Sequence, residues 1–178
     1  MVEESEYLLA ELPKSQTRDQ LSRIRNWVLE KPKRFDVLVK LYLSGNYRIT
    51  QRAVRIISQI ADIDPELVQL YLVQIVGSLS TNPSDAVKRN VVRLLQKVDI
   101  PQGLQGKVSE HCFAYLQNPK EAIAVRAFSV SVLARICLAQ PELTREFLLL
   151  MDDILPFAGP GISVRIRDAK RKLQGPGK

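Results

Sequence analysis

The sequence predicts an all-α protein in which antiparallel pairs of helices stack on one another. Apolar residues recur at positions i, i+3, i+4 and i+7, the spacing that places them on one face of a helix. This pattern returns along the chain with a fixed period, as is typical of stacked structural repeats. Prolines stand at regular places where helices would begin. Strands are not supported, because no window of four or more residues alternates cleanly between apolar and polar side chains.

The period is clearest between segments 53–60 and 91–98, which read AVRIISQI and VVRLLQKV. Their apolar positions match one for one, and a further step of the same length reaches Val132, Leu133 and Ile136. A weaker fourth copy begins at Val164, one position later than a strict period from Val125 would place it. We therefore expect one helix of each pair to carry this stripe and a second helix to follow it.

The expected elements alternate along the chain. First helices are predicted at about 16–30, 48–61, 84–98, 120–138 and 161–173, and second helices at about 33–43, 65–80, 102–117 and 141–155. The second helices begin at Pro32, Pro65, Pro101 and Pro141, because proline fixes φ and lacks the N–H that the first turn would leave unpaired. The connectors NPSDA (82–86) and NPKEA (118–122) end one helix and begin the next, with Asp85 and Glu121 placed where negative charge favours a helix N-terminus. A short acidic cap helix is expected at about 2–12 and a flexible tail at 174–178, with a single domain over 1–173.

The repeated stripe carries a recognisable motif. Residues 125–136 read VRAFSVSVLARI and residues 87–98 read VKRNVVRLLQKV. Val164-Arg165 opens the last copy, while Ile49-Thr50 opens an earlier copy that lacks the cation. The motif resembles the HEAT repeat, the helical hairpin of HEAT/armadillo-type α-solenoids, over about 48–173, and the helix-pair layout extends the likeness to 16–43.

This resemblance implies a right-handed α-α superhelix of about four to five HEAT-like helix pairs. It also implies that first helices line the convex side and second helices the concave side. One pair cannot bury both of its apolar faces alone, so neighbouring pairs must stack. A cation at the second motif position can bridge to acidic or carbonyl groups of the next repeat, and we expect such an inter-repeat ladder at Lys88, Arg126 and Arg165.

The formal net charge of +7 is divided unevenly between the two classes of helix. The expected first helices sum to +12 and the second helices to −4. Positive charge is densest in the predicted helix at about 161–173, which is the first helix of the C-terminal repeat. Its basic residues are a candidate patch for phosphate contacts: Arg165, Arg167, Lys170, Arg171 and Lys172. The polar cap that a terminal repeat needs for solubility is the alternative explanation.

The second helices carry the candidates for partner binding. Exposed tyrosines are common anchors at protein interfaces, and adjacent carboxylates could supply an acidic patch. The candidates on the concave side are Tyr42, Tyr71, Tyr115, Asp152 and Asp153.

The sequence offers no chemical constellation. Its one histidine, His111, precedes Cys112, and neighbours on a helix diverge by about 100° and so do not form a nucleophile–base pair. The two cysteines make neither a disulfide framework nor a zinc pair, and we find no phosphate loop and no Ser/His/Asp set. We therefore expect no enzyme, no cofactor and no metal. Without a signal peptide or an apolar run of membrane-spanning length, a cytoplasmic protein is expected.

Three functions remain open. The first is a non-catalytic interaction or scaffold module that binds a protein or peptide along the concave face. The alternative is a nucleic-acid-binding protein related to the HEAT-like DNA glycosylases that recognise alkylated bases, with basic helices on the phosphates. The third is a homodimer formed through the stacking surfaces at the solenoid ends.

Overall fold

The computed structural model describes residues 2–14 and 17–174. Within these ranges the chain forms eleven α-helices, three short 3₁₀ helices and no strand, which confirms the all-α prediction. The elements are α1 (Val2–Glu11), α2 (Arg18–Leu29), α3 (Pro32–Leu43), α4 (Tyr47–Ile60), α5 (Pro65–Gln69), α6 (Leu72–Gly77), η1 (Ser78–Thr81), α7 (Asp85–Leu94), α8 (Gln102–Gln117), α9 (Ile123–Ala139), η2 (Pro141–Leu143), α10 (Thr144–Ile154), η3 (Leu155–Phe157) and α11 (Pro160–Gln174). The chain divides into two compact units, Met1–Asp99 and Ile100–Lys178.

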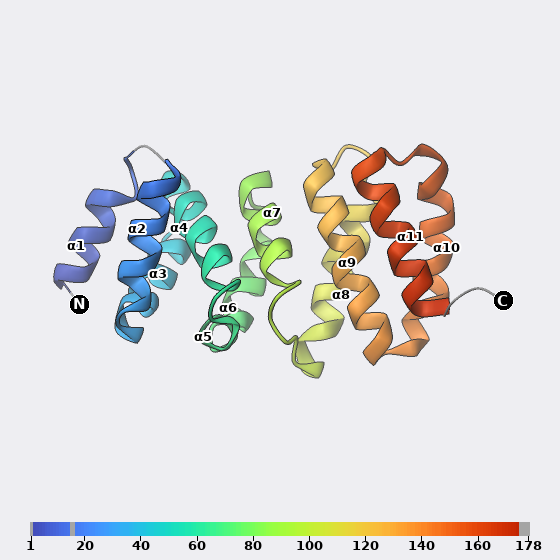
Figure 1. The fold of residues 1–178 in the computed structure, drawn as a ribbon, viewed down its shortest axis with the longest axis horizontal. Helices are drawn as coiled ribbons and strands as arrows, with labels where there is room; N and C mark the ends of the chain where they lie inside the picture. Colours follow the sequence, from blue (N-terminus) through green and yellow to red (C-terminus); the bar gives the residue numbers. More distant parts are fainter. Residues whose placement is uncertain (1, 15–16, 175–178) are drawn as a thin grey trace. The chain divides into compact units, whose positions relative to one another are not determined.

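In the first unit, α4 is the central element and packs against α2, α3 and α7 (Figure 1). Asn46 caps its N-terminus, since the side-chain Oδ1 accepts a hydrogen bond from the Ile49 N–H at 3.2 Å. The stripe that the sequence period identifies is buried, and Ile56, Ile57 and Ile60 have no exposed surface. Burying each such side chain contributes about 1.5–3 kcal/mol to folding. The apolar stripe therefore holds the unit together, as the sequence predicts.

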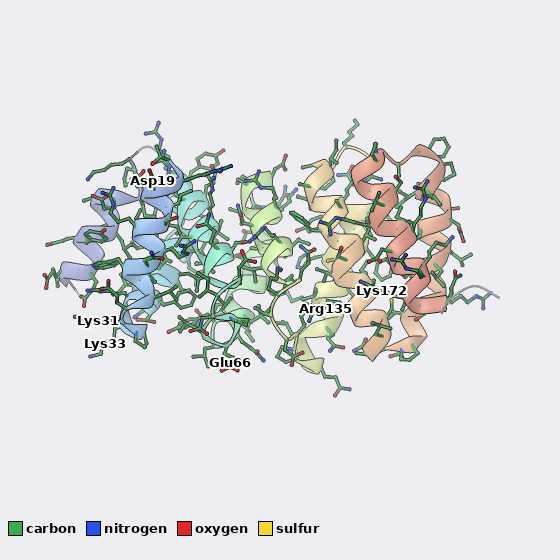
Figure 2. All side chains as sticks on the ribbon, in the orientation of Figure 1. Asp19, Lys31, Lys33, Glu66, Arg135 and Lys172 are labelled. Atoms are coloured by element: carbon green, nitrogen blue, oxygen red, sulfur yellow. The ribbon has the colours of Figure 1, made fainter. Side chains whose placement is uncertain are left out.

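The N-terminus of α2 is capped and carries a charge that complements its dipole. Thr17 caps the helix by accepting a hydrogen bond from the Gln20 N–H at 3.2 Å, and Asp19 lies in the first turn. Lys31 and Lys33 lie beyond the other end, so Figure 2 shows Asp19 and these lysines at opposite ends of α2. Asp19 therefore favours α2, whereas Lys33 belongs to the first turn of α3.

In the second unit, α9 packs against α8, α10 and α11. Figure 1 shows α9 and α11 side by side, with α8 and α10 behind them as a second layer. Val125, Val132 and Leu133 of α9 are completely buried, and Phe147 and Met151 supply the buried face of α10. The unit therefore consists of two stacked helical hairpins.

Three predicted helices differ from the structure. The predicted helix at 141–155 begins as the 3₁₀ helix η2, and its α-helical part, α10, starts at Thr144. The predicted helix at 65–80 is interrupted between α5 and α6, where Tyr71 leaves helical geometry and its ring packs edge-on against Phe35, with centroids 5.3 Å apart. This tertiary contact outweighs the helical propensity of the segment. The predicted helix at 84–98 ends as α7 at Leu94, and the next turn is held by shorter i to i+3 bonds such as that from the Lys97 N–H to the Leu94 carbonyl at 2.8 Å.

The ends of the chain agree with the prediction where the structure describes them. The expected cap helix at 2–12 corresponds to α1, which packs against α3. The expected start of the first repeat helix at 16 and nearly all of the expected tail at 174–178 lie outside the described residues, and Gln174 is the last residue of α11. Among the described residues, no helix combines the length and the apolar character needed to cross a bilayer.

Candidate interaction grooves

Each unit contains a groove between the C-terminal ends of two successive second helices. The first groove, in the unit 1–99, has a volume of about 370 Å³ and lies between the end of α3 and η1. The second groove, in the unit 100–178, has a volume of about 510 Å³ and lies between the end of α8 and the end of α10. Both volumes fall within the usual range of ligand sites, about 300–1,000 Å³.

The two grooves are equivalent by the repeat period. Thr50 lines the first groove and Arg126 lines the second. One repeat period separates Thr50 from Lys88, and the same period separates Lys88 from Arg126. Two steps of the same length join Thr81 in the first groove to Phe157 in the second. Thr50 and Arg126 both occupy the second motif position, the one expected to carry the inter-repeat ladder. This motif position therefore lies in a groove in each unit.

The hydroxyl groups of the first groove are satisfied within the protein. The Tyr42 hydroxyl hydrogen-bonds to Ser78 Oγ, and Ser78 Oγ donates to the Ile75 carbonyl at 2.7 Å. Thr50 Oγ1 donates to the Tyr42 carbonyl at 2.9 Å and so closes the C-terminus of α3. Burial raises the pKa of Tyr42 to about 12. The groove is accordingly neutral and internally bonded.

The second groove contains a cation that forms no ion pair with the described residues. Arg126 Nε is buried and has no hydrogen-bond partner there, and no carboxylate of the described chain pairs with its guanidinium. Leu116 and Ile154 are buried in the wall, and Phe157 is 90% exposed at the rim. Asp153 also lines the groove, and its side chain is exposed. This groove therefore combines apolar walls with a guanidinium that forms no ion pair within residues 2–14 and 17–174, although the carboxylate of Asp153 lines the same groove.

The three predicted ladder residues behave differently. Arg165 links α11 to α9, because its Nη1 donates to Ser131 Oγ at 2.6 Å and its guanidinium lies 5.1 Å from the centroid of Phe128. Lys88 pairs with Asp85 of its own helix at 3.8 Å. Arg126 departs from the expected ladder and makes no bridge to the described residues.

The connectors suggest why the repeats differ at this position. In the two earlier connectors an acid, Asp85 or Glu121, follows the proline. When Val164 is aligned with Val125, the residue that corresponds to Glu121 is Pro160, which carries no charge. The last connector therefore lacks the acid that the earlier ones have.

The sequence analysis missed the residues that join α4 to its neighbours. Arg93 of α7 donates to the Ser58 carbonyl at 2.8 Å and to Asp62 Oδ2 at 2.6 Å. Arg52 of α4 donates to the Leu12 carbonyl at 2.6 Å. No sequence signal distinguishes Arg93 from other cations on α7, since only the packing of the helices determines which one reaches Ser58.

The candidate phosphate-contact patch on α11 is largely paired within the protein. Lys170 forms an ion pair with Asp152, while Arg171 and Lys172 pair with Asp168 at 2.6 and 2.8 Å. Hydrogen bonds from Lys172 and then Arg171 lower the pKa of Asp168. Arg167 is exposed. These pairs reduce the positive charge that the patch presents.

The candidate residues for concave binding differ in exposure. Tyr42 and Tyr115 are buried, whereas Tyr71 is half-buried. Asp152 is engaged by Lys170, and Asp153 lies exposed in the second groove. The large apolar side chains exposed on the second helices were not among the predicted site residues: Leu43, Leu70, Val73, Leu149 and Phe157. Periodicity does not single them out, because exposure depends on how each helix is rotated in the packed unit.

The residues that could support catalysis are placed unfavourably for it. Cys112 is completely buried, and burial raises the pKa of its thiol to about 12. Burial lowers the pKa of His111, whose ring stacks on Tyr115 at a centroid distance of 6.2 Å. Within residues 2–14 and 17–174, no cluster of three or more His, Cys, Asp or Glu could hold a metal ion.

Comparison with known proteins agrees with the repeat architecture. A family model described as a HEAT repeat domain matches residues 8–172. Searches of curated proteins and of solved structures find no match. The match spans both units and almost the whole chain, and HEAT repeat domains are typically non-catalytic scaffolds for protein interaction. The chain therefore belongs to the HEAT repeat domain family.

Proposed function

We propose that this protein is a non-catalytic interaction module that binds a segment of another protein along its second helices. The observation that carries the proposal is the exposure of large apolar side chains there. Leu70 and Val73 are 79% and 70% exposed in the first unit, and Leu149 and Phe157 are exposed in the second. Phe157 also lines the second groove, and exposed apolar surface of this kind is typical of binding sites.

The arrangement in the second unit supports an elongated partner. Leu149 and Asp153 are exposed one helical turn apart on α10, and exposed Phe157 follows in η3. Asp153 and Phe157 also line the second groove. Exposed apolar side chains beside an open groove favour an extended or helical peptide segment over a fully enclosed small molecule.

The family match supports the prediction of one repeat domain over residues 1–173, because it crosses the boundary between the two units. Proteins of this repeat type bind through the surfaces of several repeats rather than through a single pocket. On this proposal both units take part in binding, each through its own second helices.

Peptide selection tests the proposal directly. Random peptides displayed on phage would be selected on the immobilised full chain, and the selected peptides would be measured against two sets of serine variants. Leu70→Ser, Val73→Ser, Leu149→Ser and Phe157→Ser change the second-helix side. Ile123→Ser and Val164→Ser, which are 72% and 62% exposed on first helices, are the matched controls.

We expect the second-helix variants to weaken binding about tenfold or more and the controls to bind within about twofold of the original chain, because anchor side chains carry most of the energy of an interface. Peptides that respond to the controls and not to the second-helix variants would place binding on the other side and refute the proposal.

A further inference from the structure

The second groove contains an ionised group for which the described chain supplies no partner. Arg126 is half-buried, and its Nε is shielded from water without a hydrogen-bond acceptor among the described residues. Buried donors are nearly always paired in folded proteins, so an unpaired one calls for an explanation. By contrast, Arg165, at the same motif position one repeat later, donates to Ser131.

The local sequence explains why Arg126 finds no carboxylate within the described chain. The connectors before α7 and α9 carry Asp85 and Glu121, whereas the corresponding position before α11 is Pro160. Proline supplies no carboxylate and lacks the backbone donor. The acid that a repeat of this type would offer here is thus absent from the connector, while the cation is present.

The surroundings of Arg126 favour an incoming carboxylate. Leu116, Ile154 and Phe157 make the walls of the groove apolar, which strengthens a hydrogen bond formed inside it. A guanidinium matches a carboxylate in geometry and charge. Asp153 lies on the same groove but does not pair with Arg126, and its exposed charge disfavours a second acid on the ligand.

The groove also needs an apolar group, because a carboxylate alone would leave most of its wall uncovered. Its volume of about 510 Å³ exceeds what one carboxylate fills. Exposed Leu149 lies outside the groove, one helical turn before Asp153 on α10, so a ligand that covers both the groove and Leu149 is a stretch of chain.

We propose that the second groove binds a partner polypeptide through an apolar side chain and, close to it in sequence, a single acidic side chain whose carboxylate accepts hydrogen bonds from Arg126. This inference rests on the proposed function and specifies the chemistry of the partner. The first groove, with neutral Thr50 at the equivalent position, has no such preference for acid.

The test uses the peptides selected on the full chain, measured by fluorescence anisotropy against three variants. Arg126→Gln removes the charge, and Arg126→Lys keeps the charge but not the planar fork. Arg145→Gln is the matched control, since Arg145 is an exposed cation at the other end of α10 and does not line the groove. Each peptide is also made with its acidic residue changed to the amide.

We expect the selected peptides to share an apolar residue with an acid close to it in sequence. Arg126→Gln should weaken their binding roughly tenfold or more, Arg126→Lys should weaken it less, and Arg145→Gln should change it by less than about twofold. The peptide with the amide should bind the original chain as weakly as the acidic peptide binds Arg126→Gln. The amide peptide should bind Arg126→Gln only slightly more weakly than either single change does, because both changes remove the same interaction. In NMR spectra of the labelled chain, the Arg126 Nε–Hε signal should shift only with the acidic peptide.

Other outcomes separate this inference from the proposed function. Peptides that are lost on changing Leu149 or Phe157 but bind Arg126→Gln normally would overturn the carboxylate site and leave the proposed function in place. Selected peptides that are rich in basic residues and bind more weakly when Asp153 is changed would also overturn the carboxylate site and leave the proposed function in place. Failure to select any peptide that responds to second-helix variants would overturn both.

Discussion

Arg93 should be one of the most stabilising charged side chains of the first unit, although it lies on no predicted site. It joins α7 to α4 through the carbonyl and hydroxyl of Ser58, at 2.8 and 3.0 Å, and through Asp62 at 2.6 Å. Ser58 is completely buried. A hydrogen bond from a charged donor contributes about 1.5–3 kcal/mol. The side chains of Arg93 and Asp62 are 34% and 32% exposed, so their ion pair adds at most about 1 kcal/mol.

Replacing Arg93 by methionine keeps the apolar stem and removes these bonds. We expect the free energy of unfolding to fall by about 2–3 kcal/mol. Asp62→Asn should cost no more than about 1 kcal/mol, because Ser58 keeps its donor. Arg89→Met, on an exposed face of the same helix, is the control and should change stability by less than about 0.5 kcal/mol.

Urea unfolding followed by tryptophan fluorescence is a suitable assay, since the single tryptophan, Trp27, lies in α2 of the same unit. Stability changes are read from the midpoints at constant slope. The reasoning would be refuted if Arg93→Met cost less than about 0.5 kcal/mol. It would also be refuted if Asp62→Asn cost as much as Arg93→Met, because the bonds to Ser58 would then contribute nothing.

Three further predictions concern individual side chains. Tyr42→Phe should cost about 1 kcal/mol in urea unfolding, since it removes the bond to Ser78. The pKa of Tyr42 is about 12 in the folded chain and about 10 in the unfolded chain. The contribution of this pKa difference to the free energy of unfolding is therefore complete below pH 10 and is lost as pH rises towards 12. The fall in stability over this pH range should be smaller in Tyr42→Phe. Burial raises the pKa of Cys112 to about 12 and that of Cys137 to about 11, and mass spectrometry should find neither alkylated by iodoacetamide at pH 8 until urea unfolds the chain. Duplex DNA should bind weakly at low salt and not at physiological salt, because Asp168 holds two cations of α11; tight binding at both salt concentrations would instead favour the nucleic-acid alternative.

Much of the fold could be predicted because burial and period coincide. The residues at i, i+3, i+4 and i+7 of α4 and α9 are buried, and Pro32 and Pro65 begin helices as their missing N–H requires. The interruption at Tyr71 could not be predicted, since it depends on the contact of its ring with Phe35 of another helix.

The candidate site was predictable in its location but less so in its residues. Assignment of second helices drew attention to α10 and to Asp153, which lines the second groove. Tyr42 and Tyr115 matched the composition of an interface, but their rings are buried, because the same aromatic character that suits an interface also suits a core. Arg126 was expected in a ladder, and only the packing reveals that its Nε is buried without an acceptor among the described residues.

The equivalence of Thr50 and Arg126 has a consequence for how such a protein can change over time. One residue closes a helix end and the other has no internal partner in the described chain, so the same position accepts very different side chains without altering the apolar stripe behind it. A single codon change there would alter the preference of one groove and leave the others as they were. Duplication of a repeat would carry its preference to a new place along the chain, so recognition can diversify in steps while the fold is conserved.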